Sequence, residues 1–441
     1  MPGSEIQRTR QHDRCRAVRY SESLATIRPF RPYRYTPKAG DPSTLLTQPY
    51  DKISPAMQAR YLAANPYNVV RIILGERRES DNDSDNVYTR AGHYFEDWIR
   101  EGVLAQDGSP AFYAYSQEFQ VPDSGEHLTR KGFIGLCKIE DYSAGVVYRH
   151  EQTLTGPKKD RLELLRHTRA HFGQIFMLYP DPDRAIDHAL DAASSGPPAL
   201  EARDDDGALH RAWPITGAEE VSRIQDLMAQ KKLLIADGHH RYETALAYRN
   251  ERLTSSPAFD AAAEYVMMTF VNMYSPGLRV LATHRVLRNL DKFDAVRFFE
   301  KAVNAGWSVA AVPNIEKLKQ RMALPEPKLV QIGVIARGET RLMQHARKEG
   351  RLDVPVLHEG VLGGLLGISE ESVRDEKYIR YVRGNDAAAA EVERAADVAF
   401  LLEPTPIEEM ARIAFAGGVM PQKSTDFYPK LLSGLTIYKL D

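Results

Sequence analysis

The chain has 441 residues, 43% of them hydrophobic, with 58 Lys and Arg against 60 Asp and Glu and a formal net charge of -2. That length corresponds to roughly two or three domains, or to one large elaborated domain with a sizeable core. The balanced charge excludes a global positive field for nucleic acid or anionic lipid. The 2 cysteines exclude a disulfide scaffold and a cysteine-based zinc ribbon. We therefore expect an enzyme-sized cytoplasmic protein without a membrane or nucleic-acid partner.

The N-terminal residues 1–27 are polar and rich in arginine, with neither the apolar stretch nor the cleavage site of a secretion signal. Because they contain little apolar surface to bury, we predict a disordered extension. No uncharged apolar run in the chain approaches ~18 residues, the length that indicates a transmembrane helix.

Residues 28–288 alternate between helix-like and strand-like segments, and we predict that they form the core. Residues 68–75, NVVRIILG, are β-branched and compact, which favours a buried strand. The acidic run at 79–86 lacks the ligand spacing and the bend glycine of a calcium loop. We predict a solvated loop there, followed by a helix over 87–101.

Later segments of the core follow the same alternation. Strands are predicted at 111–121, 128–142, 175–179, 233–236, 264–271 and 279–281, and helices at 160–172, 218–230 and 241–253. Beyond a boundary near Asn289, residues 289–441 are expected to form a C-terminal α/β region packed on the core. We predict a helix at 293–305, a strand at 329–335 and an irregular stretch before a terminal strand at 435–440. The fold class is therefore mixed α/β, or α+β.

The segment between residues 231 and 251 contains the most informative pattern, a short apolar strand, the turn Asp237-Gly238-His239-His240-Arg241 and a helix. Free backbone N–H groups and the helix dipole at such a helix start favour an anion, typically phosphate. Arg241 adds a bidentate donor for a phosphate oxygen, and Asp237 can hold Mg²⁺ or accept a proton. The alternative is an Asp N-cap followed by two surface histidines.

A second dense segment lies between residues 150 and 173, where Glu151 is followed by Lys158, Lys159 and Arg161. A carboxylate beside basic residues suits phosphoryl transfer to a hydroxyl group, because it combines a base with cations for the developing charge. The alternative is a solvated helix start with ordinary surface charges.

Two lesser candidates are polar clusters in otherwise apolar surroundings. Thr283, His284 and Arg285 follow a predicted strand, and strand ends in α/β sheets often hold ligands. The second cluster is MPQKSTDFYPK, residues 420–430, in the apolar tail. Structural roles remain an alternative for both. The phosphate loop, dinucleotide turn, nucleophile elbow, HExxH and CxxC motifs are absent from the sequence, which disfavours the enzyme classes that use them.

Taken together, these motifs resemble a bacterial family known as domain of unknown function 1015. The resemblance is carried by segments from PYDKIS at residue 49 to MPQKSTDFYPKLLSGL at residue 420. The others are NPYNVVRI (65–72), the segment 150–181, ADGHHRYETAL (236–246) and GLRVLATHR (277–285). They occur in order along nearly the whole chain.

The turn at 237–241 more distantly resembles the phosphate-binding box of the ParB/sulfiredoxin superfamily, which includes kinases of free serine. The resemblance implies a nucleotide-binding core that uses ATP, ADP or another nucleotide with Mg²⁺. The sulfiredoxin version has a reactive cysteine where this chain has His239 or His240, which argues against sulfinic-acid repair. ParB proteins also contain a DNA-binding helical domain, for which this sequence shows no clear counterpart.

Our leading hypothesis is a nucleotide-dependent phosphotransferase acting on a small hydroxylated metabolite such as serine or phosphoserine. Glu151 would be the general base, and the turn from Asp237 to Arg241 would hold phosphates and Mg²⁺. Other phosphate ligands would be Lys158, Lys159, Arg161, Thr283, His284 and Arg285. The alternatives are a nucleotide-sensing regulatory or binding protein like ParB, and a phosphatase of the same substrate class.

Overall fold

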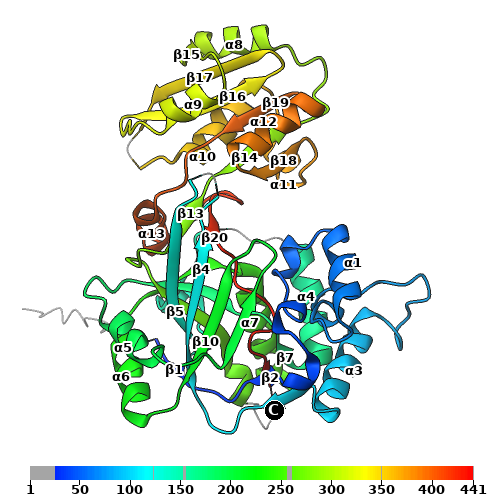
Figure 1. Ribbon diagram of the computed structural model, residues 1–441. Coiled ribbons are helices and arrows are strands. Elements are labelled where there is room, and N and C mark those ends of the chain that lie inside the picture. Colours follow the sequence, from blue (N-terminus) through cyan, green and yellow to red (C-terminus); the bar gives the residue numbers. More distant parts are fainter. Residues whose placement is uncertain (1–24, 123, 152–154, 256–260, 349, 441) are drawn as a thin grey trace, which may run out of the picture.

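The computed structural model describes residues 25–122, 124–151, 155–255, 261–348 and 350–440, which form two lobes (Figure 1). The larger lobe contains a nine-stranded sheet in the order β6-β11-β8-β12-β5-β4-β10-β9, with β1 paired to β5. Its strands are β1 (Ile27–Arg28), β4 (Phe112–Gln120), β5 (His127–Lys138), β6 (Val147–Tyr148), β8 (Ile175–Tyr179), β9 (Leu200–Arg203), β10 (Leu209–Ile215), β11 (Leu233–Asp237) and β12 (Tyr265–Asn272). Most pairs are antiparallel, but β12–β8 and β11–β6 are parallel.

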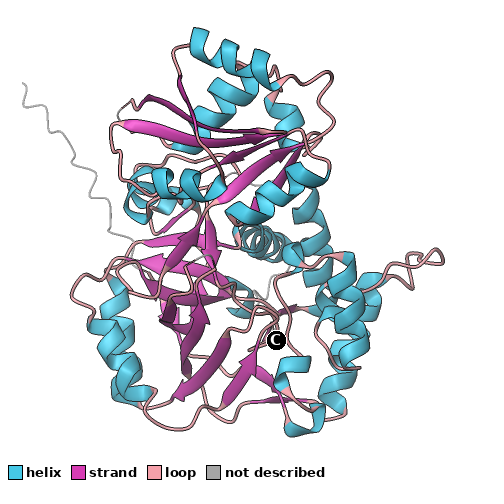
Figure 2. Ribbon diagram, turned by 45° about the horizontal axis from the view of Figure 1, so that its top comes forward, coloured by secondary structure: helices cyan, strands magenta, loops and turns pink. Residues whose placement is uncertain are grey.

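The large sheet is covered on both faces, and its central strands are therefore apolar on both sides. In β8 every residue is buried. One face packs against α5 (Ala185–Ala193), α6 (Ala218–Ala229) and part of α7 (His239–Ser255). The other face packs against α4 (Thr155–Thr168), α13 (Ile407–Phe415) and the C-terminal residues. Figure 2 shows these helices flanking the sheet.

The smaller lobe is built on a six-stranded antiparallel sheet in the order β15-β17-β16-β19-β14-β18. Its strands are β14 (Thr283–Leu287), β15 (Ser308–Ala311), β16 (Leu329–Ala336), β17 (Glu339–Ala346), β18 (Ile379–Arg383) and β19 (Val398–Leu401). Helices α8 (Ala295–Asn304) and α10 (Asp353–Val356) pack on one face, and α9 (Ile315–Met322) and α12 (Asn385–Arg394) pack on the other. Helix α11 (Glu370–Arg374) lies beside β18 (Figure 1).

After β19 the chain returns to the larger lobe. β20 (Asp426–Tyr428) pairs with β13 (Arg279–Leu281), and β21 (Tyr438–Lys439) pairs with β7 (Ala170–His171). The region expected over 289–441 is thus divided between the lobes, because the apolar C-terminal tail completes the core of the large sheet. Pairings between residues so distant along the chain leave no local signal in the sequence.

A helical layer on the N-terminal side completes the larger lobe. It consists of α1 (Pro55–Ala64), α2 (Val70–Ile73), α3 (Val87–Arg100) and the small sheet of β2 (Tyr33–Tyr35) and β3 (Leu104–Gln106). Helices α2 and α3 and the small sheet share a core with α4 and the end of the chain, and α1 contacts α2. Ala25 and Ile27 are buried, so the predicted extension over 1–27 overlaps the fold at its end, while residues 1–24 lie outside the described residues.

The mixed α/β class is confirmed, but two predictions of local structure are wrong. The segment at 68–75 contains the helical turn α2 instead of a strand, because Asn68 bonds the Val70 N–H at 2.9 Å and starts a turn. A short buried apolar run has no periodicity that separates helix from strand. The stretch before residue 435 is also regular, since it contains β17 to β20.

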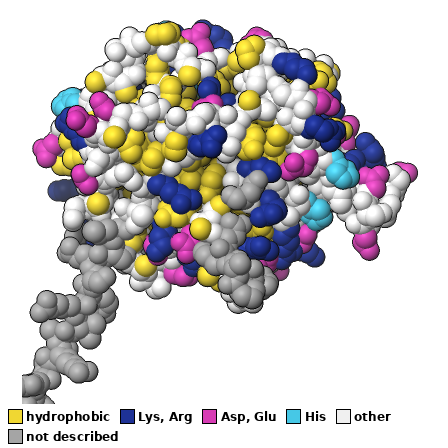
Figure 3. Space-filling view, turned by 90° about the horizontal axis from the view of Figure 1, so that it is seen from below, with side chains coloured by type: hydrophobic (Ala, Val, Ile, Leu, Met, Phe, Trp, Pro, Cys, Tyr) yellow, Lys and Arg dark blue, Asp and Glu magenta, His cyan; other side chains and the backbone are white. Residues whose placement is uncertain are grey.

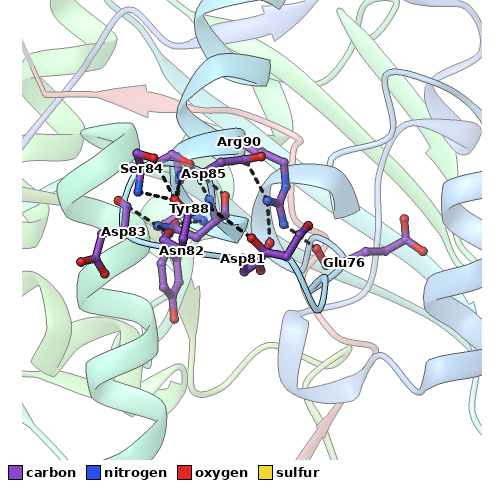
Figure 4. A network of polar contacts seen from close by, with 11 residues as sticks. Glu76, Asp81, Asn82, Asp83, Ser84, Asp85, Tyr88 and Arg90 are labelled. Atoms are coloured by element: carbon purple, nitrogen blue, oxygen red, sulfur yellow. Dashed lines mark hydrogen bonds and ion pairs between the residues drawn. The ribbon is translucent and has the colours of Figure 1, made fainter.

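The acidic loop before α3 is organised by its own polar side chains (Figure 4). Asp81 and Asp85 both pair with Arg90, at 2.7 and 2.9 Å, and Asn82 accepts hydrogen bonds from Ser84 and Asp85. Asn86 caps α3 by accepting from the backbone of Tyr88 and Thr89. The run therefore closes a loop and starts a helix, as the sequence predicts.

The described surface agrees with the balanced composition. Seen from below, Lys and Arg side chains are interspersed with Asp and Glu side chains (Figure 3). None of the helices in the described ranges is both long and apolar enough to cross a membrane.

The hydrogen bonds of the buried Asn68 side chain are expected to stabilise the fold. The side chain accepts from Val70 N and donates to the Thr44 carbonyl at 2.7 Å, and its replacement removes the partner of the buried Val70 N–H and of the partly buried Thr44 carbonyl. We expect Asn68→Ala to lower the free energy of unfolding by about 1–3 kcal/mol in urea denaturation. The exposed Asn304 provides the control, since Asn304→Ala should stay within ~0.5 kcal/mol of wild type. An equal effect of both substitutions would contradict the role of Asn68.

Candidate functional site

Four polar segments meet at the end of the large sheet that faces the smaller lobe. They are the residues after β6, the β11–α7 turn, the 3₁₀ turn Tyr50–Lys52 and the segment 420–430. We call the last of these the C-terminal polar segment. It includes β20, which lies at the junction of the lobes in Figure 1.

Lys430 forms the centre of the site. Its ammonium group lies 3.2 Å from Asp237 and 3.0 Å from Asp426, and only 6% of the residue is exposed. Burial by itself lowers the pKa of Lys430, but the two carboxylates raise it above its usual value. Burial likewise favours neutral Asp237 and Asp426, yet Lys430 and neighbouring cations hold both pKa values well below the usual range. All three groups are therefore charged at neutral pH.

Cations from both lobes surround this triad. Arg383 on β18 binds Asp426 at 2.7 Å, and Lys52 lies 3.9 Å from the same carboxylate. The pKa of Lys52 is lowered, chiefly by burial and secondly by repulsion from Lys430. The smaller lobe therefore contributes a side chain to the ionic cluster of the larger one.

The predicted phosphate turn begins with a tight bend. Gly238 has a φ of +94°, and a Cβ there would lie 3.0 Å from the guanidinium of Arg241. Arg241 folds back over the bend, binding Asp237 at 2.7 Å and donating to the Gln174 carbonyl. Only glycine combines this backbone conformation with so close an approach.

The two histidines of the turn lie in different environments. His239 is buried against His150, with ring centroids 4.7 Å apart, while His240 is partly exposed. Burial lowers the pKa of His150 to about 4 and that of His239 well below its usual value, so both rings are neutral. His150 Nδ1 donates to the Ile235 carbonyl at 2.7 Å, which leaves Nε2 to accept from Thr425 at 2.9 Å. The alternative of two surface histidines is thus wrong for His239.

Glu151 is held by the C-terminal polar segment. The N–H of Met420 donates to the carbonyl of His150, the residue before Glu151, at 2.7 Å. The side chain of Glu151 accepts through Oε1 from Lys423 N at 3.1 Å. Burial raises the pKa of Glu151 to about 7. Lys423 adopts a left-handed conformation with φ +58°, and its carbonyl accepts from Arg285 at 2.9 Å. Its backbone thus links Glu151 to Arg285.

The remaining predicted residues are distributed around this centre. Lys158 pairs with Glu243 on α7, and Lys159 is exposed on α4. Arg161 lies 4.2 Å from the centre of the Tyr50 ring and donates to the Ile73 carbonyl at 2.6 Å. Together with Arg241, Arg161 lines a cavity of about 70 Å³.

The predicted cluster on β14 is divided between the lobe's core and the site. His284 is buried and accepts from Leu402 N at 3.3 Å, and burial lowers its pKa to about 4. Thr283 contributes its carbonyl to Arg285. Of the three, Arg285 alone reaches the C-terminal polar segment through a hydrogen bond within the described residues.

The structure adds residues that the sequence analysis did not assign to the site. They are Lys52, Arg383, Asp426 and Lys430. A signal for Asp426 and Lys430 exists, because the segment 420–430 is polar within an apolar tail. The segment PYDKIS, which contains Lys52, provides a weaker signal. Their pairing with Asp237 is not readable from spacing, since Lys430 and Asp237 lie 193 positions apart.

The residues around Asp237 constrain the predicted metal site. In the described parts of the chain, no three His, Cys, Asp or Glu side chains are grouped as metal ligands. Both oxygens of Asp237 already accept from cations. Mg²⁺ usually binds through one or two carboxylates and completes its shell with substrate phosphates and water. A role for Asp237 as its protein ligand therefore stays a prediction that depends on nucleotide.

A larger cavity of about 1340 Å³, which we call the inter-lobe cavity, lies beside this cluster. Residues of the smaller lobe, including His358 and Tyr381, line one side. Met420, Pro421 and Gln422 line the other, immediately before Lys423. The C-terminal polar segment therefore lines the cavity with Met420–Gln422 and binds Glu151 through the next residue, Lys423.

The chain belongs to the family described as "Protein of unknown function (DUF1015)", whose model matches residues 27–359. No curated protein matches the chain. The sequence resemblance to this family is thus confirmed over most of the chain.

The chain is similar to several solved structures. A conserved hypothetical protein from Pyrococcus furiosus has a TM-score of 0.34 and 13% identity, covering 65% of this chain and 90% of its own. A mutant of free serine kinase in complex with ADP has a TM-score of 0.33 and 13% identity, covering 64% and 84%. SbnI with C-terminal truncation from Staphylococcus aureus has a TM-score of 0.35 and 11% identity, covering 68% and 85%. Similarity at this level does not identify a function.

The central role of Lys430 predicts a large effect on stability. Lys430→Met leaves Asp237 and Asp426 buried with fewer cations, and we expect a loss of about 3–5 kcal/mol in the free energy of unfolding. Lys131→Met removes the exposed pair with Asp191 and serves as the control, with an expected loss of about 0–1 kcal/mol. Urea denaturation of both variants measures the difference. Similar losses in the two variants would contradict the assignment.

Proposed function

We propose that the protein is a nucleotide-dependent phosphotransferase acting on the hydroxyl group of a small metabolite, with serine and phosphoserine as the first substrates to test. One observation carries the proposal. The C-terminal polar segment binds both Glu151 and the turn at Asp237, because Lys423 N donates to Glu151 and Lys430 pairs with Asp237. This shared segment supports a site in which Glu151 acts as the base and the turn at Asp237 binds phosphate.

The start of α7 provides the proposed phosphate site. The first N–H groups of a helix and its dipole stabilise an anion. Burial lowers the pKa of His240, and the charges that act on it are mixed: Glu243 and Asp51 raise its pKa, whereas Lys158 and Lys423 lower it. Mg²⁺, held between nucleotide phosphates and Asp237, would neutralise further charge during transfer.

Glu151 is the proposed general base. In the forward direction its carboxylate accepts the proton of the acceptor hydroxyl, whose oxygen forms a bond to the terminal phosphorus of the nucleotide. The bond from that phosphorus to the bridging oxygen breaks, and the shortened nucleotide leaves with the bonding electron pair. A carboxyl group with a pKa near 7 is well matched to such proton transfer.

The same geometry bears on the alternative functions. A nucleotide sensor needs only the phosphate site, so the convergence of Glu151 on that site favours transfer chemistry. A phosphatase would use similar groups to transfer phosphate to water. Product analysis with phosphoserine, with and without ADP, separates these directions.

Nucleotide binding provides the first test. Calorimetry with ATP, ADP and CTP in the presence of Mg²⁺ should show saturable binding of at least one nucleotide to wild type. Arg241→Ala should weaken it at least about tenfold, because a hydrogen bond to a charged group is lost. Arg249 lies on the same helix but donates to the Ile139 carbonyl, so Arg249→Ala should bind nucleotide normally. Absence of binding to wild type would sink the proposed function.

Glu151→Gln provides the second test. It should spare nucleotide binding and lower turnover about 10²–10⁴-fold, since the amide cannot accept the proton. Because its raised pKa keeps Glu151 protonated below about 7, wild-type turnover should increase as the pH rises through 7. Glu219→Gln, at an exposed position on α6, is the control. Unchanged turnover and an unchanged pH profile in Glu151→Gln would contradict the assignment.

A further inference from the structure

Arg285 is a buried cation beside the inter-lobe cavity. Only 1% of the residue is exposed, and its donors reach the carbonyls of Thr283 and Lys423 and the ring of His358. Among the described residues Arg285 forms no ion pair, and the carboxylate whose charge reaches it is that of Glu151, which binds the same residue, Lys423. Burial lowers its pKa to about 10. A buried charge without a carboxylate in direct contact is costly, which favours the binding of an anion nearby.

His358 connects this cation to the cavity. Its Nε2 accepts from Arg285 Nε at 3.3 Å, and burial lowers the pKa of the ring to about 3. A neutral imidazole whose Nε2 accepts must carry its proton on Nδ1. His358 lines the cavity, so it can offer this N–H group as a donor with its tautomer set by the buried arginine.

The local backbone supports a specialised role for this wall. His358 lies in a π-helical segment, Leu357–Gly363. Such segments are rare and occur frequently at functional sites. The other arginines on the cavity wall already have acidic partners, Arg351 with Glu359 and Arg374 with Glu371. Arg285 is therefore the cation here that forms no direct ion pair among the described residues.

We propose that the inter-lobe cavity is the acceptor subsite, and that His358, backed by Arg285, binds a carboxylate group of the acceptor. The role as acceptor subsite rests on the proposed phosphotransferase function. The binding of a carboxylate at His358 does not, because it depends only on the residues that line the cavity. The wall offers one neutral donor backed by Arg285, whose charge Glu151 partly offsets, and it also includes the carboxylate of Glu370, so it matches a monoanion better than a dianionic phosphate. The acceptor would thus be a small molecule that carries both a carboxylate and a hydroxyl group.

The position of the cavity fits this role. Its wall at Met420–Gln422 continues into Lys423, whose backbone binds both Glu151 and Arg285. The segment that lines the cavity is therefore continuous with the residue that binds the proposed base. The cavity is formed by both lobes, which explains how the smaller lobe would contribute to selection of the acceptor.

Calorimetry with a panel of small hydroxy acids tests the proposal. L-Serine, glycolate and D-glycerate are each titrated with their amides as neutral counterparts, without nucleotide and with ADP. We expect at least one acid to bind about tenfold or more tightly than its amide. His358→Leu should remove this preference, whereas His358→Asn should retain most of it because its amide can donate near the position of Nδ1. His93→Gln, at an exposed position on α3, is the control.

The outcomes separate the two proposals. If ADP binds but none of the acids is preferred over its amide, the acceptor subsite is wrong and the proposed function stands. If an acid is preferred and His358→Leu removes the preference, the subsite is supported even where ADP fails to bind. An unchanged preference in His358→Leu overturns the assignment of His358.

Discussion

The ion pairs of Lys430 with Asp237 and Asp426 are the constraint on which the site depends. A buried ammonium group requires acidic partners, and a buried carboxylate requires cations, so these three side chains stabilise one another. Asp237 ends the β11 strand and Asp426 begins β20, which fixes the C-terminal polar segment against the large sheet. Arg383 extends the cluster into the smaller lobe through the same Asp426 carboxylate.

The position of Glu151 follows from that arrangement. Once β20 is in place, Lys423 N can bond the Glu151 carboxylate, and Thr425 can bond His150. Burial that results from this packing raises the pKa of Glu151, whereas the nearby cations hold Asp237 ionised. Two carboxyl groups in one cluster thus acquire different protonation behaviour, which is typical of sites that separate a proton acceptor from a charge-binding group.

Most of the larger lobe could be predicted from periodicity and turn chemistry. The strand at 175–179 and the strand at 279–281 have the predicted bounds, and α3 begins after the capping residue Asn86. The error at α2 arose because four buried apolar residues suit a strand or a helical turn equally well. The prediction of an irregular stretch before residue 435 failed because β18 and β19 are short and gain their stability from pairing with distant strands.

The sequence by itself determined the strand–turn–helix around Asp237, the need for glycine at position 238 and the concentration of charge near Glu151. These features depend on contacts within a few residues, where backbone conformation and local hydrogen bonds leave a pattern. Only the tertiary structure decided that Lys430 balances Asp237, that Lys423 holds Glu151 and that Arg285 lies beside a cavity. The physical reason is that burial and long-range ion pairing are properties of the packed chain, and spacing along the sequence contains no record of either.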